Sequence, residues 1–121
     1  MKRDMDLVRT ILLEIEAHED PLKPVPLQAP GYSPQQISYH VKLLSEAGLI
    51  EAHKAGGMGT VHWFAMSLTW RGHEFLEATR SDTIWQKVKA ESKDRGVSLP
   101  FDLVQAVALK LIAAHMGLSQ S

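Results

Sequence analysis

Residues 34–47 carry polar side chains at helical spacing that could hydrogen-bond to nucleic acid. On a helical wheel, Ile37, Val41 and Leu44 fall on one arc and the polar residues fall on the other. The side chains predicted to face a ligand are Gln35, Ser38, Tyr39 and Lys42. A glutamine amide matches the hydrogen-bonding edge of adenine, and a lysine can contact guanine or a phosphate. The alternative interpretation is a solvated helix face with no ligand.

A β-hairpin predicted at residues 49–67 supplies a second set of candidate contacts. Two extended runs, LIEAHKA and TVHWFAMS, flank the glycine-rich tip GGMG, and this pattern is typical of a hairpin. The candidate ligand-facing residues on it are His53 and Lys54 on the first strand and Thr60 and His62 on the second. Affinity for duplex DNA depends on several cation–phosphate contacts, and the helix face and hairpin together offer two lysines. A single copy is therefore expected to bind DNA weakly.

The elements that must position these residues begin with a helix in residues 4–19, where apolar residues recur at helical spacing. Residues 20–32 contain four prolines, so a second helix cannot run through them, and VPLQA is at most a short extended segment. Ser33, Pro34 and Gln36 then form the pattern of a capping box with proline at the first helical position. Gly48 is placed to end that helix in the left-handed conformation.

Three helices are predicted after the hairpin. Thr69 can cap the first, WRGHEFLEATR, which contains the helix-weakening Gly72, and residues 82–94 form the second. The last helix, PFDLVQAVALKLIAAHM, is apolar around nearly its whole circumference, so it is expected either to self-associate, to bind a partner protein or to be buried within the monomer. The residues predicted to form a dimer contact are Phe101, Val104, Val107, Ala108, Leu111 and Ile112. The predicted division is a domain at 1–80 and a helical extension at 81–121.

The composition favours one small soluble protein. The chain has 121 residues, of which 45% are hydrophobic and 22% charged, with a formal net charge of -1 and no cysteine. The N-terminus mixes charged and apolar residues and lacks the apolar run of a secretory signal, so a cytoplasmic location without a membrane span is expected. No basic tail is present to attract nucleic acid.

Catalytic motifs and metal-binding patterns are absent from the sequence. The six histidines show neither H-x-x-x-H nor H-E-x-x-H spacing, and there is no G-x-S-x-G motif. The glycines at 56, 57 and 59 lack the lysine of a phosphate-binding loop. We therefore expect no catalysis, no metal and no cofactor. The three tryptophans, Trp63, Trp70 and Trp85, are predicted to anchor the core.

Three blocks, KRDMDLVRTILLEIE, PGYSPQQISYHVKLLSEAGLIEA and LTWRGHEFLEATRSDTIWQKVK, resemble an uncharacterised family of small bacterial and prophage proteins. The resemblance covers about residues 2–93. The family looks winged-helix-like and is similar, in its LTxxG segment, to the MarR and PadR regulators. The resemblance implies fold more than function. One departure is that the proline-rich DPLKPVPLQAPGY stands where a helix-turn-helix protein has its supporting helix.

The expected fold is mainly α with a small β-hairpin wing (α+β): a winged-helix domain that lacks a standard second helix and is followed by C-terminal helices. The first functional hypothesis is a DNA-binding transcriptional regulator of phage or prophage origin that binds double-stranded DNA as a homodimer. The alternative is a non-catalytic interaction module that binds another protein and not DNA.

Overall fold

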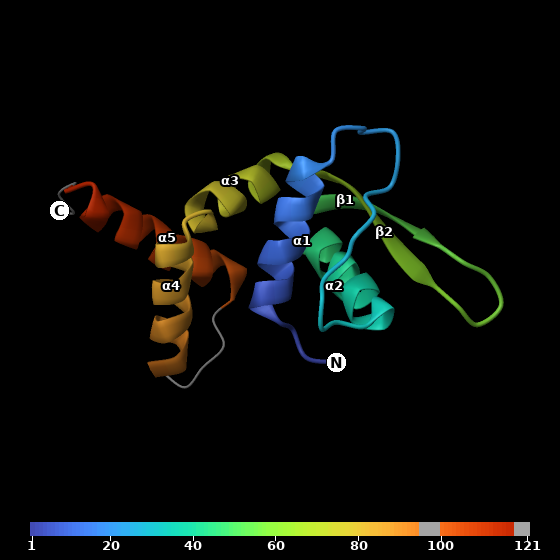
Figure 1. Cartoon of the computed structure of the whole chain (residues 1–121), viewed down its shortest axis with the longest axis horizontal. Coiled ribbons are helices and arrows are strands. Elements are labelled where there is room, and N and C mark those ends of the chain that lie inside the picture. Colours follow the sequence, from blue (N-terminus) through green and yellow to red (C-terminus); the bar gives the residue numbers. More distant parts are fainter. Residues whose placement is uncertain (95–99, 118–121) are drawn as a thin grey trace. The chain divides into compact units, whose positions relative to one another are not determined.

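The computed structural model describes residues 1–94 and 100–117, which form five helices and a two-stranded antiparallel sheet (Figure 1). The helices are α1 (Met5–Ala17), α2 (Pro34–Glu46), α3 (Trp70–Thr79), α4 (Asp82–Asp94) and α5 (Phe101–His115), and the strands are β1 (Ile50–Ala55) and β2 (His62–Leu68). This architecture confirms the predicted fold class, mainly helical with one β-hairpin. The order of elements expected for a winged-helix domain without its second helix is present.

The chain divides into two compact units, Met1–Glu74 and Phe75–Ser121, with the boundary inside α3. In the first unit, α1 and α2 lie side by side and both pack against the hairpin, which extends beyond them (Figure 1). Its core consists of side chains from all these elements: Leu7, Val8, Ile11, Leu12, Ile15, Val41, Leu44, Leu49, Ile50 and Ala65. The apolar arcs predicted for the two helices are thus the buried ones.

Local capping signals set the ends of α2. Ser33 accepts a hydrogen bond from the Gln36 amide at 3.1 Å, and the Gln36 side chain accepts one from the Ser33 amide at 2.8 Å, so the capping box is confirmed. At the other end Gly48 has φ +77°, the left-handed conformation that the sequence predicted.

The proline-rich segment between α1 and α2 forms no helix. It crosses beside β2, where the Val25 amide donates to the Ala65 carbonyl at 2.9 Å. At Val25 the segment lies against the sheet, but residues 24–29 are not part of a strand. The hairpin itself has an irregular register between Glu51 and Ala52, where β2 contributes one extra residue, and this is a β-bulge.

Two hydrogen bonds hold the start of the chain against α2. The Asp4 amide donates to Nε2 of the buried His40 at 2.8 Å, and Nδ1 of that ring lies 2.8 Å from the Gln36 carbonyl. Because the amide can only donate, Nε2 is the acceptor, and Nδ1 carries the proton that it gives to Gln36. The ring thus ties the start of the chain to α2.

In the second unit the predicted inward residues are buried: Phe75, Leu76, Thr79, Ile84, Trp85 and Val88. α4 packs against α5, with Val104 and Ala108 of α5 in the core. Trp85 is a core residue as predicted. Trp63 is half-buried, and the prediction for Trp70 is wrong, because its side chain is 81% exposed. Trp70 is the first residue of α3, and the large buried side chains of this helix, such as Phe75 and Leu76, begin more than one turn later.

Candidate nucleic-acid interface

The exposed face of α2 and one face of the hairpin enclose a hollow of about 410 Å³, here called the helix–hairpin hollow. The side chains that line it are Met1, Gln35, Ser38, Tyr39, Lys42, Lys54, Val61, His62 and Trp63. The four residues predicted on the helix and two of those predicted on the hairpin, Lys54 and His62, therefore lie around one concave surface. None of the described residues that line it is acidic.

Ser38 joins the two walls of the hollow. Its Oγ accepts a hydrogen bond from the Trp63 amide at 3.0 Å, so the polar side chain at the centre of the helix face fixes the edge of β2. This hydroxyl oxygen retains one lone pair and its own proton for a ligand. The contact also sets the position of Trp63, whose ring contributes an aromatic surface to the hollow.

Each lysine of the hollow lies over an aromatic ring. Lys42 Nζ is 5.9 Å from the centre of the Tyr39 ring, and Lys54 Nζ is 6.0 Å from that of Trp63. These are cation–π distances at their outer limit, so each contact is worth about 0.5 kcal/mol at an exposed site. Such weak contacts orient the ammonium groups and leave their protons available to an anionic ligand.

Two predicted residues do not line the hollow. His53 precedes Lys54 on β1, and because successive side chains of a strand alternate between faces, its side chain is on the other face of the hairpin. Thr60 belongs to the turn at the tip, where its amide donates to the Gly57 carbonyl at 3.0 Å. Both are exposed. The structure therefore separates them from the helix face.

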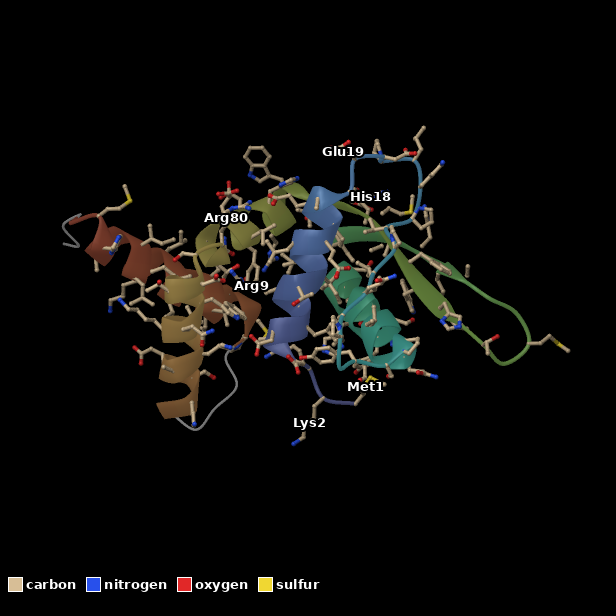
Figure 2. All side chains as sticks on the ribbon, in the orientation of Figure 1. Met1, Lys2, Arg9, His18, Glu19 and Arg80 are labelled. Atoms are coloured by element: carbon tan, nitrogen blue, oxygen red, sulfur yellow. The ribbon has the colours of Figure 1, made fainter. Side chains whose placement is uncertain are left out.

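The structure adds Met1, Val61 and Trp63 to the predicted set. Met1 lies beside α2 in Figure 2, where the hydrogen bond from Asp4 to His40 brings the start of the chain. Asp4 caps α1 by accepting a hydrogen bond from the Leu7 amide at 3.1 Å. Because aspartate is a common N-cap, its position in the sequence could have predicted that residues 1–3 precede the helix as a short arm. Trp63 was missed because it was assigned to the core.

A family model described as "Hypothetical protein (DUF2513)" matches residues 2–98 of the chain. The chain belongs to this family. An "Uncharacterized protein" of Haemophilus influenzae is 38% identical to this DUF2513 member over 118 residues, which cover 97% of this chain and 100% of the relative. No solved structure matches this chain. The match confirms the resemblance to an uncharacterised family, whereas the similarity to MarR and PadR regulators stays a prediction.

The described helices of this DUF2513 member include none that is long and apolar enough to cross a membrane. In residues 1–94 and 100–117, histidine, aspartate and glutamate side chains form no group of three or more that could hold a metal ion. The helix–hairpin hollow brings hydrogen-bonding, cationic and aromatic side chains together in one place.

Proposed function

We propose that this protein is a small DNA-binding regulator that places α2 in the major groove and the hairpin beside it. It acts as a dimer through α5, and the resemblance to prophage proteins suggests phage or prophage genes as its targets. The observation that carries the proposal is the helix–hairpin hollow, which gathers Gln35, Tyr39 and Lys42 of α2 with Lys54 of the hairpin on one concave face.

The side chains have roles that follow from their chemistry. Gln35 is exposed in the first turn of α2, and its amide fits the edge of adenine in the major groove. Lys42, two turns further on, reaches guanine or a phosphate, and Lys54 meets a phosphate from the hairpin. Pro34 has no N–H and the Gln36 amide donates to Ser33, so we assign the phosphate contacts to side chains and not to the helix end.

The charge balance sets the expected strength of binding. Two lysines face the ligand in each copy, and the whole chain has a net charge of -1. The logarithm of affinity falls with the logarithm of salt concentration with a slope of about -0.9 per phosphate contact, which gives roughly -1.8 for one copy and roughly -3.6 for a dimer. We expect measurable binding at low salt that weakens steeply as salt is added.

A second candidate function is an interaction module that binds another protein. It is supported by the exposed aromatic and aliphatic side chains of the first unit, since Trp70 is 81%, Val61 52% and Phe64 42% exposed. Tryptophan is enriched among the residues that dominate protein interfaces. Binding through such apolar contacts tolerates salt, and this separates the two functions.

The test is fluorescence anisotropy with duplex DNA from upstream of the protein's own gene and with a scrambled duplex, each at low and moderate salt. We expect Lys42→Glu to lower affinity for the upstream duplex at least about tenfold and to flatten the salt slope by about 0.9 for each copy, which is about 1.8 for the dimer. Its melting temperature should match that of the parent, because Lys42 makes no core contact.

The matched control is Lys87→Glu, which makes the same charge change on an exposed residue of α4 outside the hollow. Binding by this variant should follow the parent within about twofold. Equal losses in both variants would point to net charge and not to the α2 face. Absence of binding to either duplex at low salt would contradict the DNA proposal and leave the interaction module.

A further inference from the structure

One face of α5 is exposed although the helix is apolar. Leu103 and Leu109 are each 52% exposed, and Asp102, Ala106 and Lys110 are exposed with them. These five residues, here called the Ala106 face, are spaced at three and four positions from Ala106, so they share one side of the helix. The opposite side, with Val104 and Ala108, is buried in the second unit.

The Ala106 face has a symmetric sequence. Leu103 and Leu109 lie three residues before and after Ala106, and Asp102 and Lys110 lie four residues before and after it. In an antiparallel pair of helices related by a two-fold axis at Ala106, each residue meets the one at the mirrored position of the other copy. Leucine then meets leucine, and aspartate meets lysine, on both sides of the axis.

We propose that the Ala106 face binds a second copy of this chain, with the two α5 helices antiparallel and the two-fold axis at Ala106. A contact between two identical surfaces must be self-complementary, and the mirrored leucines and opposite charges give the Ala106 face this property. A partner of a different sequence would require no mirrored arrangement of charges. This inference rests on the dimer in the proposed function and assigns its contact face and orientation, while the contact itself requires no DNA.

The residue sizes and charges select this geometry. Alanine at the axis lets the helices approach to about 8–10 Å, the usual interaxial distance, so that the flanking leucines of both copies cover one another. The pairs of Asp102 with the partner's lysine lie about 6 Å along the helix from the axis. In a parallel pair, each Asp102 would lie opposite the same residue of the second copy, and so would each Lys110, so that like charges would face each other. These exposed charges therefore fix orientation more than affinity.

The proposal differs from the sequence prediction in the side of α5 that it uses. Val104 and Ala108 of the predicted set are buried against the rest of their own unit, and Val107, Leu111 and Ile112 are half-buried. The side chain of Phe101 lies outside the described residues. The solvent-exposed side of α5 is the Ala106 face.

Disulfide cross-linking tests the axis directly, because the parent chain has no cysteine. Ala106→Cys places one thiol of each copy at the axis, where the Cα atoms come within roughly 5 Å, a separation that a disulfide spans. Mild oxidation of the full-length protein should convert most of this variant into a covalent dimer.

The matched control is Ala114→Cys, at another exposed alanine of the same helix. In the antiparallel pair the two control thiols lie roughly 24 Å apart along the axis, so no cross-link should form. Cross-linking of both variants would indicate contacts that are not specific to the Ala106 face, and cross-linking of neither would exclude a contact centred on Ala106. Either result overturns the proposal.

Charge reversal provides a second test that does not depend on cysteine chemistry. Sedimentation of the parent should give twice the chain mass of 13.5 kDa. Lys110→Asp and Asp102→Lys should each weaken the dimer roughly tenfold, because like charges then meet, and the double variant should recover the parent's dimerisation. A parent that remains monomeric at high concentration, or a double variant that fails to recover, contradicts the two-fold pairing. No DNA is present, so this outcome is separate from that of the DNA-binding test.

Discussion

Tyr32 connects the segment before α2 to the cap of α1. Its hydroxyl donates to Asp4 Oδ2 at 2.8 Å, while Asp4 Oδ1 accepts from the Leu7 amide. The hydrogen bond to Asp4, with burial and the negative charges of Asp4 and Asp6, raises the pKa of Tyr32 to about 12. The carboxylate thus holds the hydroxyl in its protonated form.

This raised pKa predicts a loss of stability at alkaline pH. An unfolded tyrosine has a pKa of about 10, so between pH 10 and 12 the folded state keeps a proton that the unfolded state has lost. The contribution of Tyr32 is therefore complete below about pH 10 and is lost as pH rises through 12. Denaturant unfolding measured across this range should show the decline.

Tyr32→Phe removes the hydrogen bond and should lower stability by about 1 kcal/mol at neutral pH. Between pH 10 and 12 the stability of this variant should decline less than that of the parent. Tyr39→Phe is the control, since it leaves the bond from Tyr32 to Asp4 intact and should keep the parent's decline. Identical pH profiles for the parent and Tyr32→Phe would refute the assignment.

The sequence predicts individual residues well where one helix decides their environment. Helical spacing was enough to place Gln35, Ser38 and Lys42 on the accessible side of α2. It could not show that Ser38 accepts from the Trp63 amide, because those residues are 25 positions apart and meet only when the hairpin folds back. Met1 entered the hollow for the same reason, through the contact of Asp4 with His40.

Gly72 shows how a packing contact overrides helix propensity within an element. It lies in the first turn of α3, close to the backbone of Leu49, and its amide donates to the Thr69 cap at 3.1 Å. A Cβ added at Gly72 would lie 2.0 Å from the Leu49 carbonyl oxygen. Glycine is therefore required for the close approach of α3 to the start of the hairpin.

Gly72→Ala should destabilise the protein by about 2 kcal/mol, because the methyl group forces α3 away from Leu49. Helix propensity alone predicts the opposite sign, a gain of up to about 1 kcal/mol. Gly57→Ala serves as the control, since its Cβ meets no atom within 4 Å, and it should change stability by less than about 0.5 kcal/mol. Thermal unfolding of the two variants decides between packing and propensity.

The elements were predictable to within about two residues because their ends are set by local signals. The capping box before α2, Gly48 after it and the Thr69 cap before α3 all act over three or four residues. The buried side of α5 was not predictable from a helix that is apolar all round. Packing against α4 decides it, and that contact joins segments that are separated in the chain.

At the scale of the whole molecule, the two proposals combine in the dependence of DNA binding on salt. A dimer presents the lysines of two hollows, so its salt slope should be about -3.6, against about -1.8 for one copy. Lys110→Asp should halve the slope by dissociating the dimer, although residue 110 is outside the hollow. Anisotropy titrations at several salt concentrations measure both slopes.

The double variant Asp102→Lys with Lys110→Asp should restore the steeper slope along with the dimer. A slope that stays low in a protein shown to be dimeric would mean that only one hollow of the pair meets DNA. A slope unchanged in a monomeric Lys110→Asp variant would instead show that dimerisation does not contribute to binding.

The proline-rich segment beside β2 has a consequence for self-aggregation. The residues on either side of Val25, whose amide donates to the Ala65 carbonyl, are Pro24 and Pro26. Neither proline has an N–H to offer. A strand from another molecule that approached this segment would find no amide donor at either position, so we expect the segment to disfavour growth of the sheet on that side.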